Sequence, residues 1–131
     1  MSESHPGEFH ALGKPVTQPS RQLDTFLRPA HVTLVRFTSD ELTTFCPITH
    51  QPDFYTVEFE YVPDQLCIES KSLKLFLWSF REEHCFAEAL ASQMAQAVVD
   101  AIEPHYCKVT LNQNIRGGLT LTAVAEIGKK P

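Results

Sequence analysis

Residues 54–62 read FYTVEFEYV, and the chain continues at residues 69–81 as ESKSLKLFLWSFR. The first stretch alternates with a period of two, which predicts a β-strand with one buried face. One face carries Phe54, Thr56, Glu58 and Glu60, and the other carries Tyr55, Val57, Phe59 and Tyr61. The second stretch predicts a helix with Ser70 available as its N-cap, because its apolar residues have helical spacing: Leu73, Phe76, Leu77 and Phe80. A strand followed so soon by an amphipathic helix favours a mixed α+β fold.

The flanking sequence extends this pattern in both directions. Residues 31–37, HVTLVRF, predict an earlier strand, and residues 83–103 predict a second helix that ends before Pro104. The apolar stripe of that helix consists of Phe86, Leu90, Met94, Val98 and Ala101 or Ile102. Residues 106–115 and 118–127 predict two closing strands, joined by a turn at Arg116, Gly117 and Gly118. The order ββααββ predicts a four-stranded antiparallel sheet with two helices on one face, whose uncovered edges favour a ring of several subunits.

Length and composition limit the classes of protein to which the chain can belong. Its 131 residues suffice for one domain, which we place at residues 30–131. Residues 1–29 are rich in Ser, Pro, Gly and Gln, and we expect a tail or an arm that orders against a partner subunit. The net charge of −5 and the pI of about 5.6 argue against nucleic-acid binding. Because neither a signal peptide nor a membrane span is evident, we expect a cytoplasmic location.

A segment of about 15 residues without regular periodicity separates the first two predicted strands, and loops of this length are usually functional or disordered. It includes FCPITHQPDF at residues 45–54, where Pro47 and Pro52 restrict the backbone on both sides of a short span. A lone loop cysteine is more often structural than catalytic, but a stiff loop suggests a defined position for Cys46. A thiolate can add to an electrophilic carbon while a carboxyl group such as Asp53 supplies a proton. His50 between them is more often a solvated side chain than a third participant.

The other candidate residues permit two interpretations each. Cys67 and Cys107 lie in apolar alternation and are predicted core residues, whereas Cys85 at the start of the second helix is ambiguous. A lysine in the first turn of a helix, such as Lys71, opposes the helix dipole unless an anion such as a phosphate binds the free N–H groups there. Glu88 lies off the apolar stripe, which by itself indicates a solvated carboxylate.

Three motifs together resemble the NADPH-dependent 7-cyano-7-deazaguanine reductases of queuosine biosynthesis, in their short single-domain form. They are FCPITHQPDF at 45–54, ESKSLKLFLWSFR at 69–81 and NIRGG at 114–118, and the resemblance covers about residues 37–126. It implies the tunnelling fold, whose ββααββ subunits assemble into homo-oligomeric rings, here pentamers stacked to decamers, with active sites at subunit interfaces. It also implies a purine-like small-molecule substrate and an enzyme that needs no metal, nucleic acid or membrane.

The resemblance assigns a role to individual residues. Cys46 would add to the nitrile carbon as a thiolate and form a covalent thioimide, and Asp53 would give the nitrogen its proton. Two NADPH would then reduce nitrile to imine and imine to aminomethyl. The implied substrate-binding residues are Ile68, Glu69, Ser70, Ala87 and Glu88, and the implied cofactor-binding residues are Ser70, Lys71, Arg116 and Gly117.

One departure from the family pattern concerns the substrate site. The family has Phe-His-Glu where this chain has Phe86-Ala87-Glu88, and His84 lies three residues earlier. The alternatives that the sequence leaves open are an amidine-forming relative that acts on the same nitrile in transfer RNA and a non-catalytic purine-binding module. A zinc-dependent pterin enzyme of this fold is disfavoured because the chain has no His-x-His pair.

Overall fold

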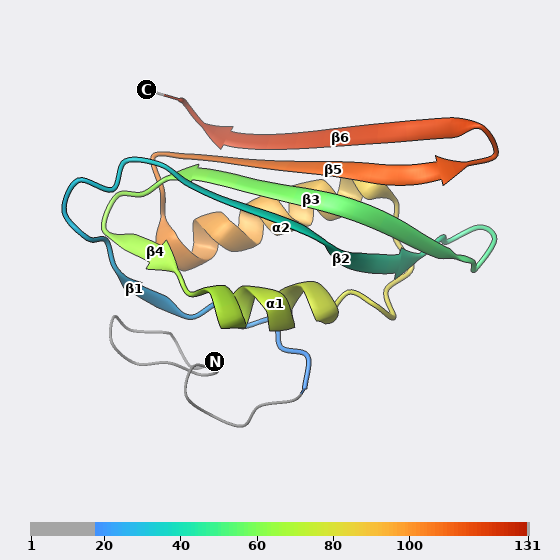
Figure 1. Ribbon diagram of the computed structural model, residues 1–131, viewed down its shortest axis with the longest axis horizontal. Coiled ribbons are helices and arrows are strands. Elements are labelled where there is room, and N and C mark those ends of the chain that lie inside the picture. The colour runs from blue at the N-terminus through green and yellow to red at the C-terminus, as the bar shows by residue number, and fades with distance from the viewer. Residues whose placement is uncertain (1–17, 131) are drawn as a thin grey trace.

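A four-stranded antiparallel sheet with two helices against one face forms the body of the molecule in the computed structural model, which describes residues 18–130 (Figure 1). The sheet order is β2-β3-β5-β6, and a separate two-stranded sheet pairs β1 with β4. The elements are β1 (Thr25–Leu27), β2 (Val35–Phe45), β3 (Pro52–Val62), β4 (Leu66–Ile68), α1 (Ser70–Trp78), α2 (Ala87–Ile102), β5 (Tyr106–Arg116) and β6 (Leu119–Gly128). This arrangement confirms the predicted fold class.

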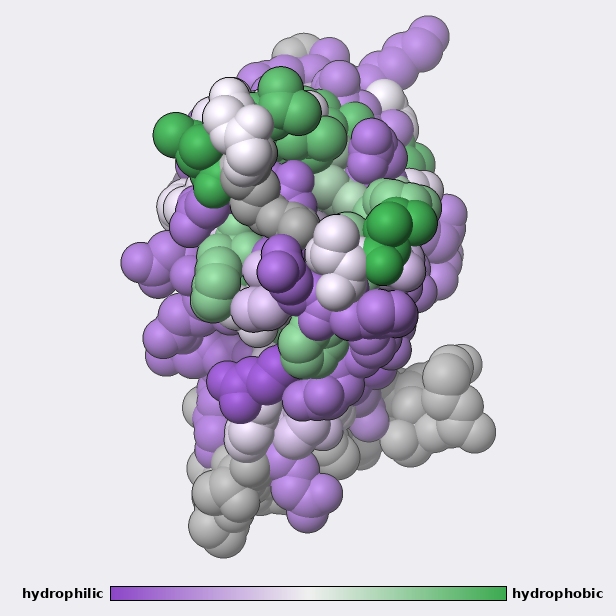
Figure 2. Space-filling view, turned by 90° about the vertical axis from the view of Figure 1, so that its right-hand side faces the viewer, coloured by the Kyte–Doolittle hydropathy of each residue, from purple (hydrophilic) through white to green (hydrophobic). Residues whose placement is uncertain are grey.

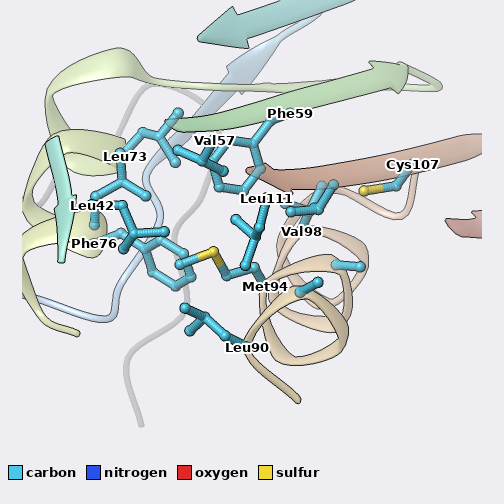
Figure 3. Packing of buried hydrophobic residues seen from close by; sticks show 14 of the residues in the cluster. Leu42, Val57, Phe59, Leu73, Phe76, Leu90, Met94, Val98, Cys107 and Leu111 are labelled. Atoms are coloured by element: carbon cyan, nitrogen blue, oxygen red, sulfur yellow. The ribbon is translucent and has the colours of Figure 1, made fainter. Parts of the chain in front are cut away.

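The core lies between the sheet and the helices, where the apolar face of the sheet packs against the apolar faces of the helices. One of the two predicted faces of β3 is buried, with at most 1% of each residue exposed at Tyr55, Val57, Phe59 and Tyr61. Figure 3 shows Met94 and Leu90 of α2 pointing toward Phe76 of α1 and Leu111 of β5. The predicted α2 stripe is correct apart from Phe86, which precedes the helix and is 55% exposed. Helix α2 begins at Ala87, four residues later than predicted at 83.

Strand β2 differs from the prediction at both ends. The alternation predicts a strand at 31–37 and a long loop after it, whereas β2 runs from Val35 to Phe45 and leaves a loop of residues 46–51. The pairing of β2 with β3 shifts register between Ser39 and Leu42, which marks a β-bulge. A bulge reverses the alternation of inward and outward residues. The period-two pattern is therefore interrupted, and the second half of the strand has the sequence character of a loop.

The expected N-terminal tail or arm, residues 1–29, is described only in part, and its ordering against a partner subunit stays a prediction. Residues 1–17 of the predicted tail lie outside the described residues, and residues 20–28 contact the domain of the same subunit. Strand β1 pairs with β4, and Leu23, Asp24 and Thr25 are buried. Strand β1 has only three residues, too few for a detectable alternation, and its partner is distant in the sequence.

The closing hairpin agrees with the prediction. β5 pairs with β6, and the turn contains Gly117 and Gly118, whose φ angles of 55° and 81° lie in the left-handed region that glycine adopts without steric cost. Cys67 and Cys107 are buried in the core, as predicted. Within residues 18–130, no helix is long and apolar enough to span a membrane.

Candidate functional site

Cys46 lies directly after β2, at the start of a short turn that closes on itself. Its backbone N–H donates to the Gln51 carbonyl at 2.9 Å, and its carbonyl accepts from the His50 N–H at 2.9 Å. His50 has a φ of 59°, a left-handed conformation that is uncommon for a residue with a side chain. The backbone of Cys46, at the start of the turn, is thus hydrogen-bonded to His50 and Gln51 at its end. The thiol-bearing residue is half-buried and has a fixed backbone, which agrees with the stiffness that the two prolines predict.

Asp53 is the second residue of β3 and is only 3% exposed. The β2–β3 register pairs Thr44 with Asp53, and Cys46 follows Thr44 by two residues. The pairing therefore brings the thiol-bearing residue and the carboxyl-bearing residue to the same end of two adjacent strands. Residues that are seven positions apart in the sequence become neighbours because a tight turn connects them.

The connection between the two helices also reaches this end of the sheet. The Phe45 N–H donates to the Glu83 carbonyl at 2.8 Å, and the Cys85 N–H donates to the Phe45 carbonyl at 3.2 Å. These bonds form a parallel bridge between Phe45 and His84. The rings of Phe45 and His84 stack with centroids 5.2 Å apart, and His50 meets His84 edge-on at 5.3 Å. Because residues 45 and 84 are distant in the sequence, no local pattern predicts this contact.

The bridge brings the start of α2 to the same region. Ala87 is the first helical residue and is buried at 4% exposure, whereas Glu88 is exposed in the first turn. A carboxylate is favourable at this position because the N-terminus of a helix carries partial positive charge. Glu88 is therefore available to a ligand, whereas the side chain of Ala87 offers only a buried methyl group.

The remaining three thiols lie in surroundings that favour their protonated form. Cys85, which precedes α2 instead of beginning it, has a pKa raised by burial and then by the Glu83 carboxylate, with a smaller effect from Asp53. Burial raises the pKa of Cys107 to about 12 and also raises the pKa of Cys67. A protonated, buried thiol is a poor nucleophile. Cys46 is thus the best candidate nucleophile in the described part of the chain.

Glu69, and not Ser70 as predicted, is the N-cap of α1. Its carboxylate accepts from the Lys71 N–H at 2.7 Å and the Ser72 N–H at 2.8 Å, and the residue is only 6% exposed. The interpretation in which an anion binds the free N–H groups has no support at Lys71 and Ser72, because Glu69 already accepts from both. Any anion at this end of α1 would depend on side chains instead. The buried Ile68 precedes Glu69, and Ser70 is exposed.

An open groove of about 470 Å³ runs between α1 and β2. Ser70, Leu73, Lys74 and Leu77 line it from α1, residues 37–41 line it from β2, and Thr56 lines it from β3. The groove combines several hydroxyl groups, the ammonium group of Lys74 and the carboxylates of Asp40 and Glu41 with apolar side chains. Lys71 lies next to Ser70 in the first turn of α1.

The predicted site residues thus form two groups within one subunit. Cys46, Asp53, Ala87 and Glu88 lie at the end of the molecule where β2 and β5 end and α2 begins, and the turn with Arg116 and Gly117 is at this same end (Figure 1). Ile68, Glu69, Ser70 and Lys71 lie at the start of α1, beside β4 and away from the Cys46 turn (Figure 1). A single subunit therefore does not bring all the predicted residues together.

The fold and the first group of residues define a tunnelling-fold protein with a candidate cysteine nucleophile and a buried carboxyl partner. A family model described as QueF-like protein matches residues 52–131, and the chain belongs to this family.

Relatives with assigned names are similar over most of the chain. The NADPH-dependent 7-cyano-7-deazaguanine reductase of Alkalilimnicola ehrlichii is 46% identical over 112 residues, which cover 84% of this chain and 87% of the relative. The enzyme of the same name from Syntrophus aciditrophicus is 45% identical over 116 residues, covering 87% and 82%. Among solved structures, the apo crystal structure of the archaeosine synthase QueF-Like matches with a TM-score of 0.71 and 30% identity, covering 76% of this chain and 97% of that one.

Proposed function

We propose that this chain is a nitrile reductase that converts 7-cyano-7-deazaguanine to 7-aminomethyl-7-deazaguanine with two NADPH, in queuosine biosynthesis. The observation that carries the proposal is the placement of Cys46 and the buried Asp53 at the same end of adjacent strands. The names of the reductase relatives, at 45–46% identity, support the choice of substrate and cofactor.

In the covalent step, the Cys46 sulfur forms a bond to the nitrile carbon and one π bond of the nitrile breaks. The electron pair moves to nitrogen, which takes a proton from Asp53, and the product is a neutral thioimide. This step splits a difficult reduction in two, because a thioimide accepts hydride far more readily than a nitrile does. The fixed backbone of the Cys46 turn supports this role, since bond formation depends on the approach of the sulfur.

Substrate recognition would come from the start of α2 and the segment before α1. Glu88 would accept hydrogen bonds from the ring N–H and the amino group of a guanine-like edge, a planar charge-assisted pair. Ala87 has no polar side-chain atom, so its contribution would be limited to its backbone and methyl group. Glu69 has both carboxylate oxygens engaged by helix N–H groups, and its role would be to hold Ile68 and Ser70 in place at the substrate.

The groove beside α1 would hold the phosphorylated nicotinamide cofactor, which supplies hydride when it is bound. Ser70 and Lys74 line the groove, and Lys71 lies next to Ser70 in the first turn of α1, so these three side chains would contact the phosphates. Leu73 and Leu77 offer apolar surface for a ring. Arg116 and Gly117, at the β5–β6 turn, would reach the cofactor from another subunit.

A ring of subunits is supported by the distribution of site residues and of exposed apolar surface. The start of α1 lies away from the Cys46 turn, so the groups would meet only across an interface (Figure 1). Figure 2, which faces the end with the turns, shows apolar side chains among polar ones. Ile48 in the Cys46 turn is 74% exposed, and Ile115 and Leu119, at the ends of β5 and β6 beside the second turn, are 71% and 75% exposed. Within the described residues, β2 and β6 are the edges of the four-stranded sheet and are available for pairing between subunits.

The likeness to the archaeosine synthase favours one alternative, in which ammonia attacks the thioimide and forms an amidine on transfer RNA. The net charge of −5 disfavours that polyanionic substrate. The alternatives differ in product. We expect NADPH oxidation with the free base, two NADPH consumed per amine formed, and an aminomethyl product identified by mass. An amidine formed from ammonium and nitrile-bearing transfer RNA, without NADPH oxidation, would refute the proposal.

The cofactor assignment predicts a selective effect of Lys71→Ala. Loss of one charged contact to a phosphate should raise the KM for NADPH about tenfold. Formation of the thioimide without NADPH should be unchanged, and Lys129→Ala, which removes an exposed lysine near the C-terminus, should change neither quantity. Steady-state kinetics and intact-protein mass measure the two effects. A parallel loss of thioimide in Lys71→Ala would place Lys71 at the substrate instead.

A further inference from the structure

Residues 20–24 lie along α1 and are hydrogen-bonded to it at several points. The Ser20 N–H donates to the Leu75 carbonyl at 3.2 Å, and the Asp24 N–H donates to the Ser72 hydroxyl at 2.9 Å. The Glu69 N–H in turn donates to the Asp24 carbonyl at 2.9 Å. We call residues 20–24 the N-terminal strap. It connects the segment before β1 to the N-cap, the first turn and the middle of α1.

Arg21 extends from the strap to the far end of α1. Its Nε donates to the Ser79 hydroxyl, and one terminal nitrogen donates to the Ser79 carbonyl at 3.3 Å and lies 3.5 Å from a Glu83 carboxylate oxygen. The guanidinium carbon lies 3.7 Å from the centroid of the Phe80 ring, which is only 1% exposed. A planar guanidinium can stack on an aromatic ring and donate from its edge at the same time, which an ammonium cannot do. Arg21 therefore holds residues 79–83 through several contacts.

Glu83, whose carboxylate pairs with Arg21, is also hydrogen-bonded through its backbone to the last residue of β2. Its carbonyl accepts from the Phe45 N–H at 2.8 Å, and the Phe45 carbonyl accepts from the Cys85 N–H at 3.2 Å. Phe45 immediately precedes Cys46. The side chain of Arg21 thus reaches Glu83, and the backbone of Glu83 holds the residue next to the candidate nucleophile.

We propose that Arg21 is a positioning residue for the covalent step. By fixing residues 79–86 against the end of β2, it sets the backbone of Cys46 relative to Asp53 and to the start of α2. Arg21 need not touch the substrate to have this effect, because a small displacement of a reacting group can lower a rate strongly. This inference rests on the proposed function for its kinetic consequence, but the structural link from Arg21 to Phe45 is independent of it.

The test compares Arg21→Ala and Arg21→Lys with a matched control, Arg28→Ala. Arg28 donates to the backbone carbonyls of Asp64 at 2.9 Å and Val32 at 3.2 Å, beside β4. Like Arg21, it therefore binds backbone carbonyls through its guanidinium group, but away from the Cys46 turn. Arg21→Ala should slow thioimide formation at saturating substrate by about tenfold or more, with the substrate Kd changed less than about twofold. Arg21→Lys should restore only part of the rate, and Arg28→Ala should keep the wild-type rate. Thermal melting of each variant reports the loss of stability.

Hydrogen exchange supplies the second measurement, which needs no substrate. The amides of Phe45 and Cys85 should exchange faster in Arg21→Ala and should be unchanged in Arg28→Ala. Unchanged exchange at both amides would overturn the proposal, as would an equal rate loss in the two alanine variants. If the wild type formed no thioimide while exchange changed as expected, the structural link from Arg21 to Phe45 would stand, and the proposed function would fail together with the kinetic role of Arg21.

Discussion

Replacing Cys46 by alanine is expected to abolish covalent attachment of 7-cyano-7-deazaguanine completely. Addition of a thiol to a nitrile releases nothing, so the wild-type protein should gain the full mass of the substrate when no NADPH is present. Cys46→Ala has no sulfur at the end of β2, and burial raises the pKa of each of the other three thiols, which makes them poor nucleophiles. Intact-protein mass spectrometry after incubation with the nitrile measures the gain directly.

Cys85→Ala is the matched control because Cys85 is also half-buried and lies one residue beyond the Phe45–His84 bridge. Since burial raises the pKa of its thiol, Cys85 should not be the nucleophile, and its removal should leave the mass gain intact. Non-covalent binding of the nitrile should remain measurable in Cys46→Ala. A full mass gain in Cys46→Ala, or its loss in Cys85→Ala, would contradict the assignment.

Replacing Asp53 by asparagine is expected to lower the rate of thioimide formation by about 10²–10⁴-fold, the usual contribution of a positioned proton donor. Asparagine has nearly the same shape as aspartate but cannot deliver an acidic proton to the nitrile nitrogen. Because Asp53 is only 3% exposed, water cannot easily replace it. The rate follows from single-turnover mass measurements, and substrate affinity from equilibrium binding.

Asp64→Asn serves as the control for this substitution. Asp64 is an exposed residue that follows the end of β3 opposite to the Cys46 turn, and its Oδ1 lies 3.5 Å from Nε2 of His105. It should keep the wild-type rate, and circular dichroism should show that both variants are folded. A rate within about threefold of wild type in a folded Asp53→Asn protein would remove Asp53 from the proposed mechanism, since a positioned proton donor contributes far more than that.

Local patterns explain the parts of the fold that could be predicted. The alternation in β3 and the helical spacing in α1 each depend on residues a few positions apart, so the sequence alone separates the two faces of β3 and identifies the apolar face of α1. The turn at Gly117 and Gly118 has the same local origin, since left-handed φ angles favour glycine. These features determine the element order and hence the fold class.

The motifs likewise indicate candidate site residues from the sequence alone. The loop with Cys46 and Asp53 is recognisable because two prolines in a short, aperiodic segment suggest a fixed conformation. The nearness of the two residues then follows from the β2–β3 register, which pairs Asp53 with Thr44. Their chemical roles remain predictions, as do those of Glu88 and Lys71.

Tertiary structure alone decided the features that depend on partners far away in the chain. The bulge in β2 and the three-residue β1 exist because distant strands supply their hydrogen bonds. The choice of Glu69 over Ser70 as N-cap depends on where the chain enters α1, which the bond from the Glu69 N–H to Asp24 helps to fix. These pairings cannot be predicted from local sequence patterns.

The same limit applies to the surroundings of the candidate nucleophile. The sequence by itself determined which thiol and which carboxyl group to consider, because residue type and local stiffness are properties of a short segment. Only the folded chain places His84 against Phe45, and Arg21 against Glu83, because these contacts join segments that are separate in sequence. Packing between distant segments, which no local periodicity encodes, therefore sets the geometry around Cys46.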